Sequence, residues 1–425
     1  MNRVQTNFGM KTRRTERLKE AVIAAFSHPA AEVSARLRGF NSADWKKVLF
    51  WLDASGLALY LLDRLTSLGL QHCLPAPILV RLMQNLRDNR VRTAALLDEA
   101  DHVSRALRAR SVTCALLKGF TLFPESVPDC SFRYQLDLDF LVADRDRVAT
   151  EEVLSNLGYR LHAVSGDTLE FKSRVSAEPD MNRLYQARPQ RSLELHLLPA
   201  ADEGTTRQHR LARVQLRAVQ GKSLPALSPP DLFLQQALHL FKHLCSEHTR
   251  ASWVLEFARH LRARHDDLGF WHEVESLAST EERADIAIGA VTLLATRTFG
   301  EVAPAELSRW TIDRLPSDVR LWIETYGKRV LLTDFPGSKL YLLLRTHLQS
   351  ESGTHRAALR RLVLPRHLPP RITHGEAGES LSARLRRFRV EAGFVLFRLR
   401  FHLVEGLRYA VESSRWQRRL TGITN

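Results

Sequence analysis

Apolar residues recur every three or four positions along the first hundred residues, which is the spacing of one face of an α-helix. The segments TERLKEAVIAAF and ADWKKVLFWLDASGLALYLLDRLTSL both show this spacing. A third helix is predicted to begin after Pro75-Ala76-Pro77 and to run through LRDNRVRTAALLDEADHVSRALRAR. The pattern therefore predicts an N-terminal helical region over residues 1–110.

The pattern changes at Ser111, where short apolar or alternating runs take over. TCALL, LDLDFLV, YRLHAV, TLEFKSR and SLELHLL are each typical of a strand. Between the second and third lies a predicted helix, DRVATEEVLSNLG, with Asp144 at its start and Gly158 at its end. We expect a compact core of mixed strands and helices over residues 111–205, in a protein of the α+β class.

Helical spacing returns after the prolines of SLPALSPPD. Asp231 begins a strong helix, LFLQQALHLFKHL, and helical patterns continue to about Gln349, which predicts a C-terminal helical domain over residues 206–349. The Pro- and Gly-rich stretch VLPRHLPPRITHGEAGES predicts a linker over residues 350–380. Residues 381–425 form an arginine-rich amphipathic segment, interpreted as a terminal helix, although FRLRFHL alternates as a strand would.

Charge and composition narrow the class of partner and compartment. The chain has 425 residues and a formal net charge of +15, which favours a polyanionic partner such as a nucleotide, a nucleic acid or an anionic membrane surface. Its four cysteines are far apart, which argues against a zinc site or a disulfide framework. The apolar run near the start is too short for a signal peptide, and no stretch approaches the roughly 20 apolar residues of a spanning helix. A reducing cytoplasm is the expected compartment.

Candidate chemistry gathers on the predicted strands. Asp137 and Asp139 are two positions apart in LDLDFLV, so their side chains point to the same face, and Glu194 lies on the later strand LELHL. Ionised carboxylates held close together repel each other unless a cation neutralises them. Mg²⁺ binds through one or two carboxylates plus substrate phosphates, and two ions can clamp the attacking and leaving oxygens of a displacement. We therefore predict a catalytic metal site at these three acids.

Basic residues precede the acids in the chain. Lys118 and Gly119 close the first strand, and Arg133 lies in the loop before the Asp-x-Asp strand. Glycine lets a backbone approach a phosphate, lysine supplies a point charge, and arginine offers a fork for bidentate contact. These three residues are the predicted phosphate-binding positions.

Histidines add two further candidates. His196 lies two residues beyond Glu194, on the same strand face, where it could bind phosphate, orient a ligand or simply pack beside the site. His239 and His243 have the spacing of a helical zinc pair, but no Glu follows His239 and no third ligand is evident. A role in the core or in contact with a base is the better interpretation of that pair.

The motifs LLKGFTLF, FRYQLDLDFLV, NLGYR and LELHLLP, in this order, resemble the bacterial family called uncharacterised nucleotidyltransferase, a branch of the polymerase-β-like superfamily. WKKVLFWLDASGLA upstream, and LSPPDLFLQQALHLFKHL and SWVLEFARHL downstream, are also similar, so the resemblance covers roughly residues 20 to 270. The chain has Lys-Gly where the superfamily usually has Gly-Ser, a bulky Leu136 before the first Asp, and Glu256 where an Asp is commoner.

The resemblance implies a small mixed-sheet polymerase-β-like nucleotidyltransferase core flanked by helical domains. It implies Mg²⁺ or Mn²⁺ held by Asp137, Asp139 and Glu194, and a nucleotide bound by Lys118, Gly119, Arg133 and His196. The expected reaction moves a nucleoside monophosphate from an NTP such as ATP to a hydroxyl on a protein, sugar or small molecule, releasing pyrophosphate.

Two other classes of function stay open at this point. One is a catalytically silent nucleotide-binding or scaffold protein of the same fold, and the other is a nucleic-acid-binding protein. The basic terminal segment adds an anionic membrane surface or a protein as a further candidate partner, and with it a membrane-peripheral location.

Overall fold

The computed structural model describes residues 2–173, 183–188, 190–199, 209–348, 362–363, 365 and 380–424. It divides into two compact units, one formed by residues 1–241 and 250–315 and the other by residues 242–249 and 316–425. The division of the chain into five segments stays a prediction, because the compact units follow different boundaries. Each unit is described by itself.

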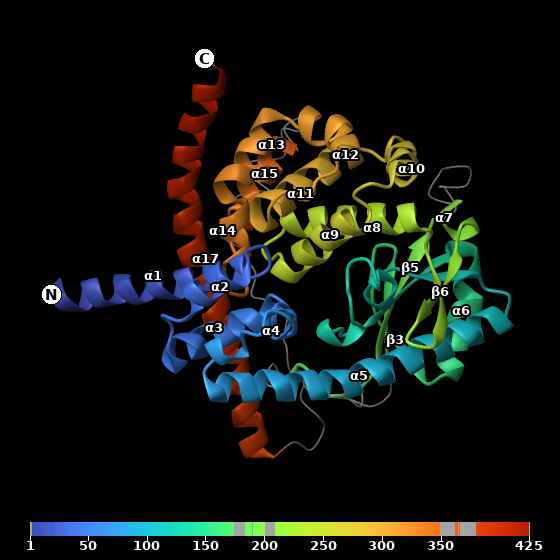
Figure 1. Ribbon diagram of the computed structural model, residues 1–425. Coiled ribbons are helices and arrows are strands. Elements are labelled where there is room, and N and C mark those ends of the chain that lie inside the picture. The colour runs from blue at the N-terminus through green and yellow to red at the C-terminus, as the bar shows by residue number, and fades with distance from the viewer. Residues whose placement is uncertain are drawn as a thin grey trace. The chain divides into compact units, whose positions relative to one another are not determined.

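The first unit begins with helices, as the apolar spacing predicts (Figure 1). Asn41 begins one of them with a capping box, in which its side chain accepts from the Asp44 amide while the Asp44 side chain accepts from the Asn41 amide. The longest follows Pro75, which ends the preceding segment and suits the entry to a helix. The elements are α1 (Asn2–Ala24), α2 (Ala30–Leu37), α3 (Ser42–Ala54), α4 (Ala58–Ser67), η1 (Gln71–Cys73) and α5 (Ala76–Ala109).

A seven-stranded mixed sheet follows, in the order β3-β4-β5-β2-β1-β7-β6. β2 pairs in parallel with β5 and β1 with β7, while the other four neighbouring pairs are antiparallel. The strands are β1 (Cys114–Leu116), β2 (Leu138–Ala143), β3 (Tyr159–Ser165), β4 (Thr168–Ser173), β5 (Ser192–Leu198), β6 (Gln215–Val219) and β7 (Lys222–Ala226). A mixed sheet with helical flanks confirms the predicted α+β class.

Alternation along the central strands divides the sheet into two unlike faces. Leu138, Phe140 and Val142 of β2 pack in the main core with residues of α5 and of α6 (Arg147–Asn156). Leu141 belongs to a second, smaller cluster, and so it faces the other way. The side chains at Asp139 and Glu194 occupy this second face, because residues of opposite parity along a strand point to opposite sides.

Two strands lie outside the predicted core. β6 and β7 extend the sheet beyond residue 205, and the sequence analysis did not predict them. β6 is an edge strand whose Leu216 is exposed, and Pro225 lies within β7. An edge strand needs no second partner and buries little apolar surface, so β6 shows only a weak alternation of apolar and polar residues. Pro225 interrupts the strand pattern of β7.

The first unit continues with helices, beginning with a short α7. The predicted helix at Asp231 is confirmed, although it begins two residues earlier. The elements are α7 (His209–Ala212), α8 (Pro229–Leu244, whose last turn belongs to the second unit), α9 (Ala251–Ala263), α10 (Leu268–Ala278), α11 (Ala284–Phe299), α12 (Ala305–Trp310) and η7 (Ile312–Arg314).

The second unit is helical where the structure describes it. Its elements are α13 (Ser317–Trp322), η8 (Ile323–Gly327), α14 (Lys328–Leu331), α15 (Tyr341–Leu348) and α17 (Leu381–Thr424). The terminal segment is one long helix, so the strand alternative for FRLRFHL is wrong. Most of the predicted linker, residues 350–380, lies outside the described residues. Within the part of the chain that is described, no helix is both long and apolar enough to cross a membrane.

Asp231 joins the sheet segment to the start of α8. Its carboxylate is fully buried and accepts two bonds from Arg213, at 2.7 and 2.8 Å, and one from the Ser228 hydroxyl at 2.6 Å. Replacing Asp231 with Ala leaves Arg213 without its partner, and we expect a loss of about 3–5 kcal/mol in the free energy of unfolding, measured by urea denaturation. Asp266→Ala, at a carboxylate that is 97% exposed, is the matched control and should change stability by less than about 0.5 kcal/mol. Equal stability of the two variants would contradict this account.

Candidate functional site

The register of two parallel strands brings the candidate acids together. Asp139 of β2 lies directly beside Glu194 of β5. Both side chains therefore project from the sheet face opposite α5 and α6, and His196, two residues along β5, shares that face. The predicted convergence of Asp139 and Glu194 from separate strands is a property of this register.

The three side chains form a tight group. One ligand atom from each of Asp139, Glu194 and His196 lies within 4.8 Å of the others, and no other group of three potential ligands meets this condition among the described residues. His196 Nε2 is 3.1 Å from Asp139 Oδ1 and 3.6 Å from Glu194 Oε2. Its Nδ1 is 3.2 Å from the Thr168 hydroxyl, so the neutral tautomer with hydrogen on Nε2 satisfies both Thr168 and Asp139.

Lys118 neutralises the most buried of the acids. Its Nζ lies 3.0 Å from Asp139 Oδ1, the oxygen that His196 also contacts. Burial by itself raises the pKa of Asp139, but the hydrogen bond from His196 and the charge of Lys118 outweigh it and hold that pKa well below its usual range. Asp139 is therefore an anion held by two donors.

Asp137 precedes the first residue of β2 rather than lying within the strand. It is not a member of the three-ligand group, but its charge acts on the group. Burial, and then the charge of Asp139, raise the pKa of Asp137. Burial raises the pKa of Glu194 as well, with further contributions from Asp137 and Asp139. The three acids are thus close enough to disfavour one another's ionisation.

Arg133 is bound to a helix of the same unit. Its Nε lies 3.3 Å from both carboxylate oxygens of Glu256 on α9, and Glu256 also accepts a bond of 2.9 Å from the Tyr60 hydroxyl. Glu256 is 1% exposed, so this carboxylate depends on its two partners for compensation. The charge of Arg133 still reaches Asp137, whose pKa it lowers.

Gly119 has a positive φ of 66° and packs against the Gln135 carboxamide. A Cβ at this position would lie 2.0 Å from Gln135 Oε1. Gln135 in turn donates through Nε2 to the backbone carbonyl of Asp137 at 2.7 Å. The Lys-Gly turn and the start of the Asp-x-Asp strand are therefore held together through one side chain.

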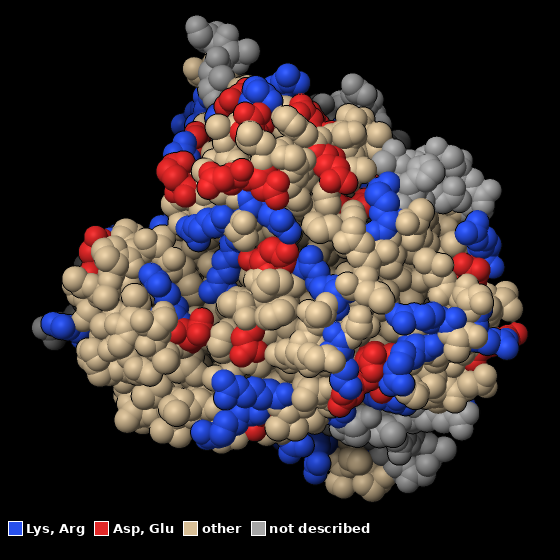
Figure 2. Space-filling model, turned by 45° about the vertical axis from the view of Figure 1, so that its right-hand side comes forward, with Lys and Arg blue, Asp and Glu red and all other residues tan. Residues whose placement is uncertain are grey.

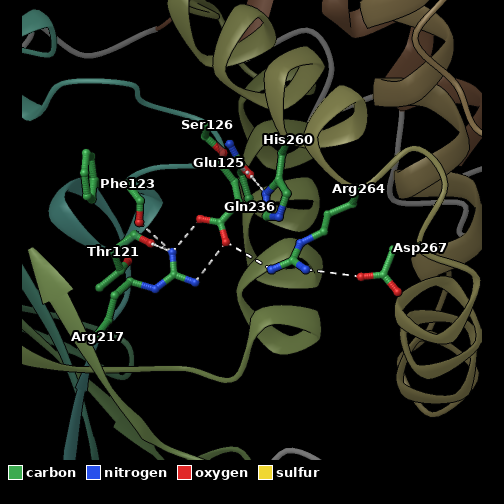
Figure 3. A network of polar contacts seen from close by, with 9 residues as sticks. All are labelled: Thr121, Phe123, Glu125, Ser126, Arg217, Gln236, His260, Arg264 and Asp267. Carbon is green, nitrogen blue, oxygen red and sulfur yellow. Dashed lines mark hydrogen bonds and ion pairs between the residues drawn. The ribbon is translucent and has the colours of Figure 1, made fainter.

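The segment after this turn is held by a second polar network (Figure 3). Arg217 on β6 donates to the carbonyls of Thr121 and Phe123 and to the Glu125 carboxylate, at 2.7–2.8 Å. Arg264, beyond the end of α9, reaches Glu125 from the other side at 3.1 Å. Both arginines thus tie the backbone that follows Lys118 to the sheet edge and to the helices.

A buried histidine completes this network. His260 Nδ1 is 2.9 Å from Gln236 Oε1, which also accepts from the Ser126 hydroxyl at 3.2 Å. Burial lowers the pKa of His260 to about 3, and Arg264 and Arg217 act in the same direction while Glu125 opposes them. His260 is therefore neutral in the folded protein, linking α9 to α8.

Two arginines near the acids were not identified from the sequence. Arg250 stacks over the rings of Tyr134 and Trp253, at 4.7 and 5.0 Å, and its charge lowers the pKa of Asp137. Arg92 on α5 donates to the Gln135 carbonyl at 3.0 Å and so supports the approach to β2. No local motif marks either residue, because each is far from the strands in sequence.

The histidine pair on α8 has a different setting from the acids. His239 lies 5.2 Å from the Trp253 ring in edge-on contact and lines a small pocket with Lys118 and Arg133. Neither His239 nor His243 belongs to a three-ligand group among the described residues. The pocket places His239 beside the basic residues of the site.

Neutralising the two aspartates should have opposite effects on stability when divalent ions are absent. The raised pKa of Asp137 means that its ionised form is disfavoured in the folded state, so Asp137→Asn should stabilise the protein at pH 7, with the gain fading as the pH falls through the folded pKa and absent below about pH 4. Asp139→Asn leaves Lys118 and His196 without an anion and should cost about 1–3 kcal/mol. Urea denaturation in EDTA measures both effects, and shifts of the same sign would contradict the charge assignment.

The neutral His260 should make the protein sensitive to acid. Its folded pKa of about 3 lies below the value of about 6.5 expected in the unfolded chain, so the unfolded state takes up the proton first. Stability should fall by about 1.4 kcal/mol per pH unit below about pH 6 from this residue. His260→Gln should remove that slope, whereas His265→Gln, at a half-exposed side chain, should keep it. The measurement is the free energy of unfolding from pH 7 to pH 5, and parallel curves for wild type and His260→Gln would exclude the assignment.

Comparison with known proteins identifies the family of this chain. No curated protein matches the chain. One solved structure that it resembles is an antigenic nucleotidyltransferase-like protein from Paracoccidioides brasiliensis, with 12% sequence identity over 45% of this chain and 91% of that one, at a TM-score of 0.29. A TM-score of this size establishes no shared fold. The family described as uncharacterised nucleotidyltransferase matches residues 41–300, which is more than half of the chain and includes all of the candidate site. The chain therefore belongs to this nucleotidyltransferase family.

Proposed function

We propose that this protein is a metal-dependent nucleotidyltransferase that moves a nucleoside monophosphate from an NTP, such as ATP, to a hydroxyl acceptor. The observation that carries the proposal is the group formed by Asp139, Glu194 and His196, whose ligand atoms lie within 4.8 Å of one another beside Lys118. Membership of a nucleotidyltransferase family supports a nucleotide as the substrate.

The donor set fits a divalent cation. Carboxylate oxygens together with substrate phosphates suit Mg²⁺ or Mn²⁺. Asp139 and Glu194 would hold the ion together with Asp137, whose charge already acts on both. Burial, and then the neighbouring carboxylates, raise the pKa of Glu194 and of Asp137, and a bound cation would favour the ionised form of both. When bound, such an ion neutralises phosphate charge and aligns the attacking and leaving oxygens.

The basic residues supply the complementary charge. Lys118 and Arg133 face the triphosphate, with Arg133 oriented by Glu256, and His196 and the Gly119 turn lie on the nucleotide side. The acceptor hydroxyl oxygen forms a bond to the α-phosphorus, and the bond from that phosphorus to the bridging oxygen breaks. Pyrophosphate leaves, and the hydroxyl proton is taken up by a carboxylate of the cluster.

A catalytically silent nucleotide-binding protein is the second candidate, and one observation favours it. Asp139 Oδ1 already accepts from both Lys118 and His196, so that carboxylate is compensated without a metal. A nucleic-acid-binding function has less support, because basic and acidic side chains are interspersed on the face drawn in Figure 2 instead of forming one basic surface.

The test of transfer uses purified protein, Mg²⁺ or Mn²⁺ and each of the four NTPs labelled at the α-phosphate, with cell extract as the source of acceptors. We expect label transfer and pyrophosphate release by the wild type. Asp139→Asn and Glu194→Gln should lower the rate by about 100-fold or more, because an ion that stabilises transition-state charge contributes several kcal/mol.

Asp266→Asn, at an exposed carboxylate, is the matched control and should keep the wild-type rate. Equal turnover by Asp139→Asn and wild type would exclude Asp139 as a required ligand. Absence of turnover, combined with nucleotide binding that calorimetry finds independent of metal, would favour the silent binding protein.

A further inference from the structure

The C-terminal helix α17 has one face that the second unit holds firmly. Glu412 accepts from the Tyr326 hydroxyl at 3.1 Å, and Glu405 accepts from the Ser338 hydroxyl at 2.9 Å. Trp416 is 1% exposed and its ring lies 5.8 Å from that of Tyr326. α17 is the long red helix that leads to the C-terminus in Figure 1, and these contacts determine which of its faces stays outside.

The outer face of α17 is unusually apolar. Half of the large apolar side chains that the described residues expose lie on this helix. Six of them follow one another at helical spacing and are 51–71% exposed: Leu385, Phe388, Leu396, Leu399, Leu403 and Leu407. At 1.5 Å per residue the stripe from Leu385 to Leu407 extends for about 33 Å along the helix, so it is a continuous apolar surface and not a set of isolated exposed residues.

Charge on the helix is divided between the two faces. α17 contains ten arginines, no lysine and three acidic residues, Glu391, Glu405 and Glu412. The three glutamates are separated by 14 and 7 residues, and hence lie on one side of the helix, which is the side buried through Glu405 and Glu412. The outer face therefore combines the apolar stripe with exposed arginines such as Arg386, Arg389 and Arg400, and α17 contributes no carboxylate to it.

We propose that the outer face of α17 docks on an anionic lipid bilayer. The apolar stripe enters the boundary between headgroups and acyl chains, and the flanking arginines pair with lipid phosphates, as in helices that lie in the plane of a membrane. A second copy of the chain is a poorer occupant, because the arginines of two such faces would repel each other without a carboxylate to compensate them. A neutral apolar groove would leave the arginines without partners.

The test is co-sedimentation of the full chain with large vesicles of phosphatidylcholine alone or of equal parts phosphatidylcholine and phosphatidylglycerol. We expect at least tenfold tighter binding to the vesicles that contain phosphatidylglycerol, weakened by added salt because the arginine contribution is screened. Replacing Leu396, Leu399 and Leu403 together with Ser should weaken binding at least tenfold. Replacing Arg386, Arg389 and Arg400 with Gln should weaken binding and flatten its dependence on salt.

Val80→Ser with Val91→Ser is the matched control, since both side chains are exposed apolar residues on α5, and this variant should bind as the wild type does. Circular dichroism verifies that each variant is folded, and the arginine and leucine variants test the proposal independently. Equal binding to both vesicle types, or binding unaffected by either α17 variant, would overturn it. If the wild type does not bind vesicles, and light scattering finds that it is a dimer that the leucine replacements dissociate, the face would be assigned to self-association instead.

Discussion

The pairing of β2 with β5 holds two carboxylates close together, and the charged side chains around the site compensate their repulsion. Asp139 and Glu194 have ligand atoms within 4.8 Å, where two unit charges repel by about 3–4 kcal/mol at an effective dielectric constant of about 20. The register cannot relax this contact, since a slip of one residue would turn apolar side chains away from the core. Lys118 and His196 compensate the negative charge of Asp139. Burial and the neighbouring carboxylates still raise the pKa of Glu194 and of Asp137.

The arginines beside the site and beside the segment that follows Lys118 are themselves oriented by acids from elsewhere in the chain. Arg133 is held by Glu256, and Arg217 and Arg264 are held by Glu125. Each pair connects a loop of the sheet with a helix or with the sheet edge, so the orientation of the positive side chains is set by residues distant in sequence.

Periodicity was sufficient to predict the five strands from β1 to β5 and the alternation of their faces, because both are properties of a local two-residue repeat. The approach of Asp139 to Glu194 depends on the pairing of β2 with β5. Periodicity was insufficient for β6, an edge strand that buries little apolar surface, and for β7, a five-residue strand interrupted by Pro225. It also could not identify Arg250 or the partner of Arg133, since partner choice across the fold leaves no local signal. FRLRFHL illustrates a different limit. Its seven residues favour a strand, but over a longer window Glu391, Glu405 and Glu412 are 14 and 7 residues apart, which keeps them on one side of a helix.

The topology of the sheet also sets the order in which the sheet can form while the chain is synthesised on the ribosome. β1 lies between β2 and β7, and its Leu116 pairs with Ala226, which is synthesised much later. One edge of this central strand therefore stays open while β2 to β6 emerge, and β2 likewise waits for β5. Helices α1 to α5 need only neighbouring sequence and can form early, so nascent chains would combine a helical start with an unfinished sheet. In that interval the open strands are exposed to other chains, which makes the midpoint of synthesis the stage most vulnerable to aggregation.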